Sequence, residues 1–283
     1  GFGSDETTGN LELNGYLNLN LVNNLNFGET FRLNYRSDEN DQKTFNAQLT
    51  LPYLFKTPIG SELELTIFKK DSTFTTAEQA ANVYYQITPK QKLFLGLRST
   101  QSNSLALENS SNLLDYKTNA YEIKYTYINR NSKNPLFPAN SALEIRLSTA
   151  NRKTLDTQTI QSLYFLKASK LFNLTTKNSF YLNIHAQAID SETLLLNELI
   201  RFGGINSIRG FEENSIDASG LVVIVSEYRY QLSPTLYVHS IIDAASFETP
   251  RQSNQKLYGF GFGFGLLTNA GLLKFNLANG KTE

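Results

Sequence analysis

Few side chains in this sequence are of the types that perform catalysis or bind metals. The chain has two histidines, His185 and His239, and no cysteine, and it contains neither an HExxH nor a GxSxG pattern. Arg209, next to Gly210, is a candidate of another kind, because a guanidinium group forms charge-assisted and often bidentate hydrogen bonds with a carboxylate. Such bonds fix a segment in place. We therefore expect no catalysis, no metal and no other cofactor.

Period-two alternation of apolar and polar residues is the dominant pattern and identifies the elements that would carry these side chains. In residues 11–21, LELNGYLNLNL, the leucines share one face of a strand and the glutamate and asparagines share the other. Similar segments predict roughly fourteen strands, many of them about 9–11 residues long, as a tilted membrane-crossing strand requires. The clearest others are residues 31–36, 45–51, 62–68, 93–98, 121–127, 143–147, 180–188, 221–230, 236–244 and 272–277.

Composition and strand number favour a membrane barrel over a water-soluble sheet. The 283 residues carry a formal net charge of zero, and no run of 18 apolar residues could form a membrane-spanning helix. Leu, Phe, Tyr and Ile fill one face of strand after strand, and polar residues fill the other, as expected for lipid outside and water inside. We predict that residues 1–283 form a single all-β domain, a transmembrane antiparallel β-barrel, with aromatic residues such as Tyr84 and Tyr228 at the interfaces with water.

Residues 191–220, SETLLLNELIRFGGINSIRGFEENSIDASG, form an unusually long connection that contains Arg209. Loops of this length inside a compact domain are uncommon and are usually either functional or disordered. The Leu, Ile and Phe residues in it argue against a solvated, disordered loop. The sequence therefore predicts a functional loop here.

Two predicted strands that follow this connection direct charged side chains away from lipid. In the first, Glu227 and Arg229 alternate with tyrosines. In the second, His239 and Asp243 alternate with aliphatic residues. Since successive side chains of a strand point to opposite faces, all four are predicted to face the lumen of the barrel.

The order of motifs in this half of the chain resembles the C-terminal barrel of a superfamily of outer-membrane proteins. That superfamily comprises bacterial surface antigens, the central subunit of the outer-membrane barrel assembly machine and the two-partner secretion transporters. The motifs are FGGINSIRGFEEN (202–214), VSEYRY (225–230), HSIIDAAS (239–246) and GFGFGFGLLTNAGLLKFNLANG (259–280).

The resemblance implies a barrel of the 16-stranded type, with residues 191–220 folded back into its lumen. The tip of the loop would be formed by Ile208, Arg209, Gly210 and Phe211, and the loop would be supported by Phe202, Gly203 and Gly204. The resemblance also implies that Arg209 meets Asp243 on the inner wall, with Glu227 as a second acidic contact. The family's Phe-x-Asp-x-Gly wall motif falls on Ile241, Asp243 and Ala245, where only the aspartate is retained.

Residues 258–267, YGFGFGFGLL, place large apolar side chains on one face of a predicted strand and nothing on the other. Glycine normally weakens a strand, so a bare face calls for a reason. We expect that the glycines leave room for the folded-in loop and Phe211, or that they permit sharp curvature of the sheet. The bare face consists of Gly259, Gly261, Gly263 and Gly265.

The function implied by the resemblance is the assembly and insertion of β-barrel proteins, or the translocation of polypeptides, through a seam between the first and last strands. The expected partners are outer-membrane lipid, unfolded β-barrel or secreted polypeptides, and accessory lipoproteins or periplasmic proteins, with no nucleic acid. The expected location is the outer membrane of a Gram-negative bacterium. Two other functions stay open, a passive diffusion porin and a structural barrel that serves as scaffold of a larger outer-membrane complex.

Both ends of the sequence bear on the extent of the domain. The first and last barrel strands are expected to be incomplete in residues 1–283. The periplasmic polypeptide-transport-associated domains that precede the barrel in this superfamily are not recognised within these residues.

Overall fold

The computed structural model describes residues 2–4, 11–13, 15–37, 42–105, 113–131, 134–252, 254–269 and 271–283. Regular structure in these residues is β apart from one turn of 3-10 helix, η1 (Leu54–Lys56). No helix among them is long and apolar enough to cross a membrane. The strands are β1 (Phe2–Ser4), β2 (Leu11–Leu13), β3 (Gly15–Val22), β4 (Thr30–Ser37), β5 (Lys43–Leu51), β6 (Ile59–Lys70), β7 (Phe74–Thr88), β8 (Gln91–Ser104), β9 (Tyr116–Arg130), β10 (Ala139–Lys153), β11 (Gln158–Asn173), β12 (Asn178–Ser191), β13 (Ile200–Phe202), β14 (Ile216–Ala218), β15 (Gly220–Ser233), β16 (Leu236–Glu248), β17 (Gln255–Thr268) and β18 (Gly271–Thr282).

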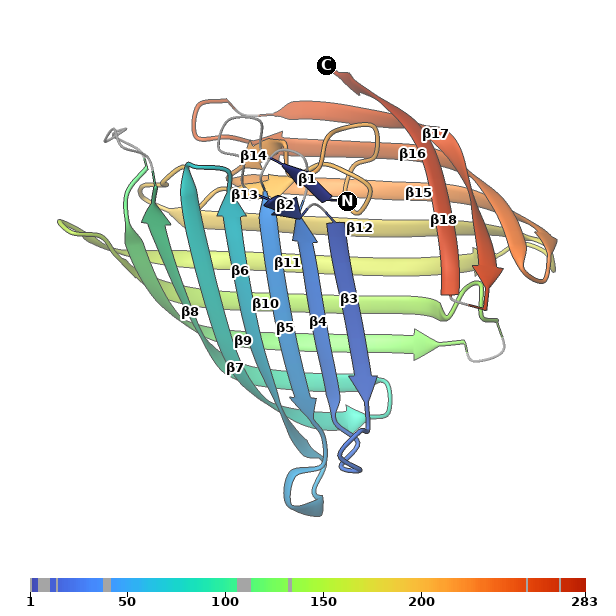
Figure 1. The fold of residues 1–283 in the computed structure, drawn as a ribbon, viewed down its shortest axis with the longest axis horizontal. Coiled ribbons are helices and arrows are strands. Elements are labelled where there is room, and N and C mark those ends of the chain that lie inside the picture. Colours follow the sequence, from blue (N-terminus) through green and yellow to red (C-terminus); the bar gives the residue numbers. More distant parts are fainter. Residues whose placement is uncertain are drawn as a thin grey trace. The chain divides into compact units, whose positions relative to one another are not determined.

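Fourteen of these strands form one sheet, in agreement with the roughly fourteen predicted. Its order is β18-β17-β16-β15-β12-β11-β10-β9-β8-β7-β6-β5-β4-β3, so that almost every strand is bonded to its neighbours in sequence (Figure 1). The exception is β15, which pairs antiparallel with β12 across the long connection. Within that connection β13 and β14 pair with each other as a separate two-stranded sheet.

The prediction of one strand over residues 11–21 is wrong. Residues Leu11–Leu13 form β2 and pair with β1, whereas Gly15–Val22 form β3 and pair with β4. The sequence has an Asn-Gly pair at positions 14 and 15, which is a strong turn signal, and β3 begins at Gly15. Alternation that continues across the pair concealed the division.

The chain divides into two compact units. The first contains residues 1–123, 148–161 and 191–198, and the second contains residues 124–147, 162–190 and 199–283. Each unit is described by itself below.

In the first unit the distribution of side chains is inverted relative to a water-soluble protein. On β8, Leu95 and Leu97 are 61% and 59% exposed, whereas Arg98 and Ser102 on the opposite face are buried. Soluble sheets bury their apolar face, and charged residues are almost never fully buried without partners. An apolar exposed face is what a lipid environment requires.

Tyr84 does not lie at a lipid-facing interface, contrary to the prediction. Its ring is 2% exposed and lies 5.0 Å from the ring of Phe94, centroid to centroid. The ring fills the space beside Gly60, its cross-strand partner, where a Cβ atom would lie 2.2 Å from the ring. The exposed aromatic residue is the next one, Tyr85, because successive side chains of a strand point to opposite faces.

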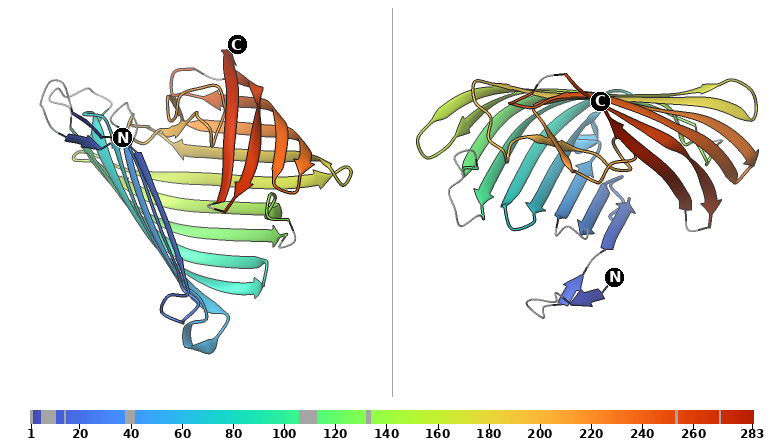
Figure 2. Two further views of the ribbon diagram at one scale, coloured as in Figure 1. Left: turned by 45° about the vertical axis from the view of Figure 1, so that its right-hand side comes forward. Right: turned by 90° about the horizontal axis from the view of Figure 1, so that it is seen from above.

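The second unit shows the same inversion and contains the long connection. On β17, Phe260 and Phe262 are exposed, whereas the opposite face of the neighbouring strands buries Glu227, Arg229 and Asp243. The connection folds over this buried face as the β13–β14 hairpin (Figure 2). An apolar cluster joins the hairpin to β15, β16 and β17 through Ile200, Phe202, Ile208, Ala218, Leu221, Val223, Ala245 and Leu257.

The exposed apolar face gives a first prediction. Ile242 is 57% exposed in the middle of β16, and Ser246 lies on the same face near the end of that strand. A lysine in the middle of a lipid-facing strand costs about 2–4 kcal/mol, and the cost falls to about 0–1 kcal/mol near the interface. We expect Ile242→Lys to lower the free energy of unfolding in lipid vesicles by the larger amount and Ser246→Lys by the smaller. Equal effects of the two variants would contradict the assignment of this face to lipid.

Candidate functional site

The tip of the long connection is held by a buried ion-pair network around Arg209. The guanidinium group donates from Nε to Asp243 Oδ2 at 2.7 Å and from Nη2 to Asp243 Oδ1 at 2.6 Å. The backbone N–H of Arg209 also donates to Asp243 Oδ2, at 3.1 Å. Nη1 donates to Glu227 Oε1. One arginine is thus bidentate on one carboxylate and bridges to a second, the strongest arrangement available to these groups.

The network is buried, so each of its charged groups needs a partner of opposite charge. The side chain of Arg209 is 5% exposed and that of Asp243 is 0% exposed. Burial alone would lower the pKa of Arg209, but the hydrogen bonds and negative charges of Asp243 and Glu227 raise it above its ordinary value. The guanidinium group therefore stays charged, and its two carboxylate partners stay compensated.

A second layer of polar groups surrounds Glu227. Arg229 Nε donates to Glu227 Oε2 at 2.7 Å, so this carboxylate accepts from two arginines, one on each oxygen. His239 Nε2 lies 4.0 Å from Glu227 Oε1 and 2.8 Å from Asn276 Oδ1. The four inward residues on β15 and β16 thus form one continuous network, as their alternation allows.

Arg229 is also enclosed by aromatic rings. Its guanidinium carbon lies 4.1 Å from the ring centre of Tyr181 and 5.0 Å from that of Phe137. The ring of Tyr237 contacts Phe137 edge-on, with 4.9 Å between centroids. Cation–π contacts of this kind hold the guanidinium plane in one orientation and so fix Glu227 for Arg209.

The tip approaches the wall closely because of Gly210. Its φ is +94°, and a Cβ atom there would lie 2.5 Å from the backbone of Asn279 and Gly280 in β18. The residue before the arginine, Ile208, is fully buried in the apolar cluster described above. Phe211 packs at the edge of that cluster, and its ring occupies the space beside Gly280. All four residues of the Ile-Arg-Gly-Phe sequence therefore contact the wall.

The base of the tip is shaped by Phe202, Gly203 and Gly204. Phe202 is 1% exposed and meets Phe247 of β16 edge-on. Gly203 and Gly204 have φ of +116° and +89°, which L side chains rarely adopt. A Cβ atom at Gly203 would also lie 2.4 Å from the carbonyl oxygen of Glu212, across the base of the tip.

The four glycines of β17 meet four different neighbours. Gly259 faces the tip, since a Cβ atom there would lie 2.2 Å from the carbonyl oxygen of Arg209. Gly265 faces the ring of Tyr237, its cross-strand partner. Gly261 and Gly263 face carbonyl oxygens of β18, those of Leu277 and Phe275. The expectation that the bare face accommodates the loop thus applies to Gly259, whereas Phe211 lies against Gly280, which the sequence analysis did not single out.

The wall motif has Ile241 and Ala245 in place of Phe and Gly, and both residues are buried. Ile241 is 1% exposed and Ala245 belongs to the apolar cluster that contacts Phe211. Asp243 lies between them and accepts the bonds from Arg209. The aspartate is the residue of this motif that bonds to the tip.

The arrangement can position a segment, because Arg209 of the tip bonds to Asp243 and Glu227 of the wall. Within the described parts of the chain, no group of three or more His, Cys, Asp or Glu side chains is placed to hold a metal ion. His185 shares the face of Val223, its partner in the register, and its ring lies 5.2 Å from that of Phe165. This histidine stands apart from the network around Arg209.

The family of the chain follows from its sequence profile. The Omp85 superfamily domain matches residues 23–283. The chain belongs to the Omp85 superfamily. No individual curated protein matches the sequence.

Solved structures of Omp85-type barrels have a similar fold. BamA from Haemophilus ducreyi lacking POTRA domains 1–3 has a TM-score of 0.69 and 14% identity, over 100% of this chain and 71% of that chain. CdiB from Acinetobacter baumannii has a TM-score of 0.66 and 16% identity, over 94% of this chain and 53% of that chain. CdiB from Escherichia coli has a TM-score of 0.66 and 12% identity, over 95% of this chain and 56% of that chain. The chain thus spans about half the length of the two CdiB chains.

These matches confirm the predicted superfamily, and the 14-stranded antiparallel sheet confirms the predicted all-β fold class, which is consistent with the transmembrane barrels of the neighbouring structures. Membership of the Omp85 superfamily supports a general role in outer-membrane β-barrel assembly or in secretion.

Sequence reasoning missed a buried arginine of the first unit, Arg98. Its Nε donates to Glu122 Oε2 at 2.8 Å, its Nη1 contacts Glu78, and its Nη2 lies 3.6 Å from Glu64 Oε2. These residues lie on four strands, β6 to β9, and each faces away from the exposed leucines. Strand parity predicts that these four side chains face the same side of the sheet. The register of the four strands would in addition have predicted that they lie close together.

Proposed function

We propose that the protein assembles β-barrel proteins into the outer membrane of a Gram-negative bacterium, or translocates polypeptides across it. Residues 1–283 would act as one barrel domain, with residues 191–220 as a brace within its lumen. The observation that carries this proposal is the docking of Arg209 on Asp243 and Glu227 in a member of the Omp85 superfamily.

The proposed mechanism is physical and makes no covalent bond. An incoming polypeptide would pair its backbone with a strand edge at the seam implied by the family, by β-augmentation. The docked tip would keep the inner wall rigid while the seam strands part. Support for this role comes from the contacts of the tip with β15, β16, β17 and β18 together.

Reconstitution in lipid vesicles tests the proposal directly. A urea-unfolded outer-membrane β-barrel is added to vesicles that contain the protein, to empty vesicles and to vesicles that contain an unrelated barrel of similar size. We expect faster folding of the substrate, or delivery of a secreted substrate into the lumen, with this protein alone. If neither rate exceeds those of both controls for any barrel or secreted substrate tried, the proposed function is wrong.

A porin is the second candidate, and the charged inner face favours it. The buried cluster of Arg98 and Glu122 would suit a water-filled lumen. A docked brace should obstruct such a channel. We expect low single-channel conductance for the protein and a clear rise when residues 203–215 are replaced by a short Gly-Ser linker. High conductance of the unaltered protein, unchanged by that replacement, would favour the porin.

A scaffold role would have a different signature. Stable partner subunits would remain with the protein after extraction in mild detergent, and reconstituted vesicles would show neither assembly nor conductance. The accessory lipoproteins or periplasmic proteins expected from the family would be found in the same extraction.

A further inference from the structure

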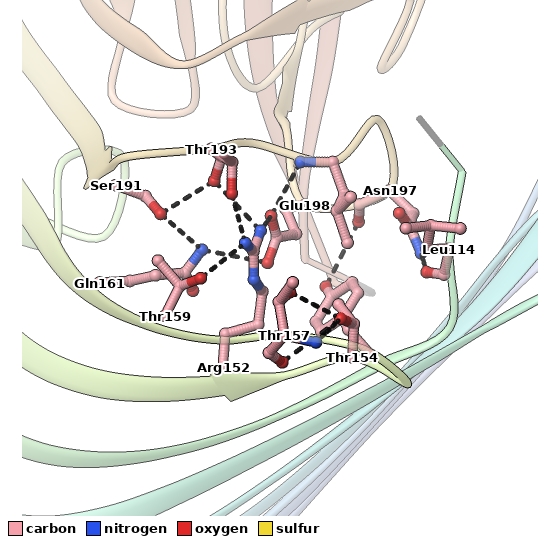
Figure 3. Close-up of polar contacts among 12 residues, drawn as sticks. Leu114, Arg152, Thr154, Thr157, Thr159, Gln161, Ser191, Thr193, Asn197 and Glu198 are labelled. Atoms are coloured by element: carbon pink, nitrogen blue, oxygen red, sulfur yellow. Dashed lines mark hydrogen bonds and ion pairs between the residues drawn. The ribbon is translucent and has the colours of Figure 1, made fainter. Parts of the chain in front are cut away.

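The beginning of the long connection is held by a polar cluster that is separate from the network at Arg209. In the first unit, Arg152 at the end of β10 is 1% exposed (Figure 3). Its Nη1 donates to Glu198 Oε2 at 2.7 Å and to the carbonyl oxygen of Thr193 at 3.1 Å. Its Nη2 donates to the hydroxyl oxygens of Thr193 at 2.6 Å and Thr159 at 3.2 Å. A single wall arginine thus makes three of its four bonds to the connection.

Glu198 is bonded on both oxygens. Oε1 accepts from Gln161 Nε2 at 3.1 Å, and Oε2 accepts from the backbone N–H of Leu195 at 2.9 Å as well as from Arg152. Its side chain is 4% exposed. The carboxylate therefore closes a turn of its own segment and attaches that turn to the wall.

Asn197 adds a further attachment next to Glu198. Its side-chain Nδ2 donates to the carbonyl oxygen of Leu114 at 2.9 Å (Figure 3). It also donates to Ser102 Oγ at 2.8 Å. The hydroxyl of Tyr116 donates to the carbonyl oxygen of Asn197 at 3.4 Å. Residues 193–198 consequently have buried polar contacts to β8, β9, β10 and β11 within the first unit.

The two attachments of the connection have opposite polarity. At Arg209 the connection supplies the cation and the wall supplies two carboxylates. At Glu198 the connection supplies the carboxylate and the wall supplies the cation.

We propose that Arg152 and Glu198 form a second, independent docking point that fixes residues 191–198. Arg152 and Glu198 are positioning residues for the brace, so the inference deepens the proposed function and its relevance to transport rests on that function. The docking itself does not depend on transport.

Hydrogen exchange of the folded, full-length chain tests the docking without a transport assay. Glu198→Gln keeps the shape of the side chain and removes its charge, and Glu192→Gln is the matched control because Glu192 is exposed in the same segment. We expect Glu198→Gln to speed exchange in peptides covering residues 192–198 by about tenfold or more. Exchange in residues 203–215 should change by less than about twofold, since sites that share no partner act independently. Glu192→Gln should change neither.

Charge reversal tests the pairing of Arg152 with Glu198. Glu198→Arg should speed exchange of residues 192–198 more than Glu198→Gln does, and the double variant Arg152→Glu/Glu198→Arg should restore most of the protection. Unchanged exchange in both single variants would overturn the docking point. Equal acceleration in residues 192–198 and 203–215 would overturn its independence. The pairing of Arg152 with Glu198 would be overturned if the double variant did not regain protection of residues 192–198 while the peptides of the sheet stayed protected.

Transport measurements on the same variants separate this inference from the proposed function. If Glu198→Gln loosens residues 192–198 as expected but the unaltered protein neither folds nor secretes any substrate, the docking point stands and the proposed function fails. If the unaltered protein is active and Glu198→Gln changes neither exchange nor activity, the proposed function stands and the second docking point is wrong.

Discussion

Arg209→Ala is expected to release the tip of the connection while the sheet stays folded. The substitution leaves Asp243, which is fully buried, and Glu227 without their shared cation. Removing one partner of a buried pair costs about 3–5 kcal/mol, because the remaining charge is uncompensated. This cost reduces the stability of the docked tip and leaves that of the sheet unchanged, since water reaches both carboxylates once the tip is undocked. Hydrogen exchange of residues 203–215 should therefore rise by on the order of a hundredfold or more.

Arg201 is the matched control for this prediction, because it is an arginine of the same connection. Its Nε lies 3.4 Å from Asp217 across the β13–β14 hairpin, and Asp217 is partly exposed. Partly exposed pairs contribute about 0–1 kcal/mol. Arg201→Ala should therefore leave exchange in residues 203–215 within a few fold of the unaltered protein.

Arg209→Lys separates charge from shape at the same position. Lysine keeps the positive charge but cannot donate two parallel bonds to Asp243, so its effect should be intermediate. Under the proposed function, assembly or translocation activity should follow the same order, with Arg209→Ala lowest. A tip as protected in Arg209→Ala as in the unaltered protein would refute the docking, and full activity with a released tip would refute its role in transport.

Period two was sufficient to predict the direction of the wall residues of the site. Glu227, Arg229, His239 and Asp243 all face the buried side of their strands, as alternation required. Strand parity is a local property that each strand carries in its own sequence. The resemblance to the family supplied the partner in the loop, Arg209, which alternation could not have reached.

The contacts that irregular connections make with the strands could not be predicted from the sequence. Phe137 reaches Arg229 from the connection between β9 and β10, and Glu198 reaches Arg152 from the connection after β12. Neither connection has a period that fixes which side chain points where, and 46 residues separate Arg152 from Glu198. Their pairing depends on the path of each connection through space, which the alternation of residues in the strands does not encode.

The glycines of β17 show the same limit in a different form. The sequence establishes that their face is bare, but each space is filled by whatever lies across the strand or above it. The ring of Tyr237 fills one, carbonyl oxygens of β18 fill two, and the backbone of the tip fills the fourth. Of these glycines, Gly259 is therefore the position at which a substitution tests docking of the tip, since Gly261 and Gly263 lie against β18.

Gly259→Ala is the second substitution with a large expected effect. Its Cβ atom would lie 2.2 Å from the carbonyl oxygen of Arg209, and backbone cannot move aside as a flexible side chain can. Overpacking of this kind costs about 1–3 kcal/mol or occasionally more. Gly220→Ala is the matched control, because its nearest neighbour across the sheet would be the Cβ atom of Ala188 at 3.7 Å, an ordinary contact. We expect faster exchange of residues 203–215 in Gly259→Ala and no change in Gly220→Ala.

The double variant Gly259→Ala/Arg209→Ala shows whether the two substitutions act on the same event. If each of them releases the tip, the second has little left to release, and their effects on exchange of residues 203–215 will be far from additive. Gly261→Ala should instead combine additively with Arg209→Ala, because its Cβ atom would meet the carbonyl oxygen of Leu277 in β18. Additive effects of Gly259→Ala and Arg209→Ala would mean that the glycine serves the curvature of the sheet, and the space beside it would then have no role in docking the tip.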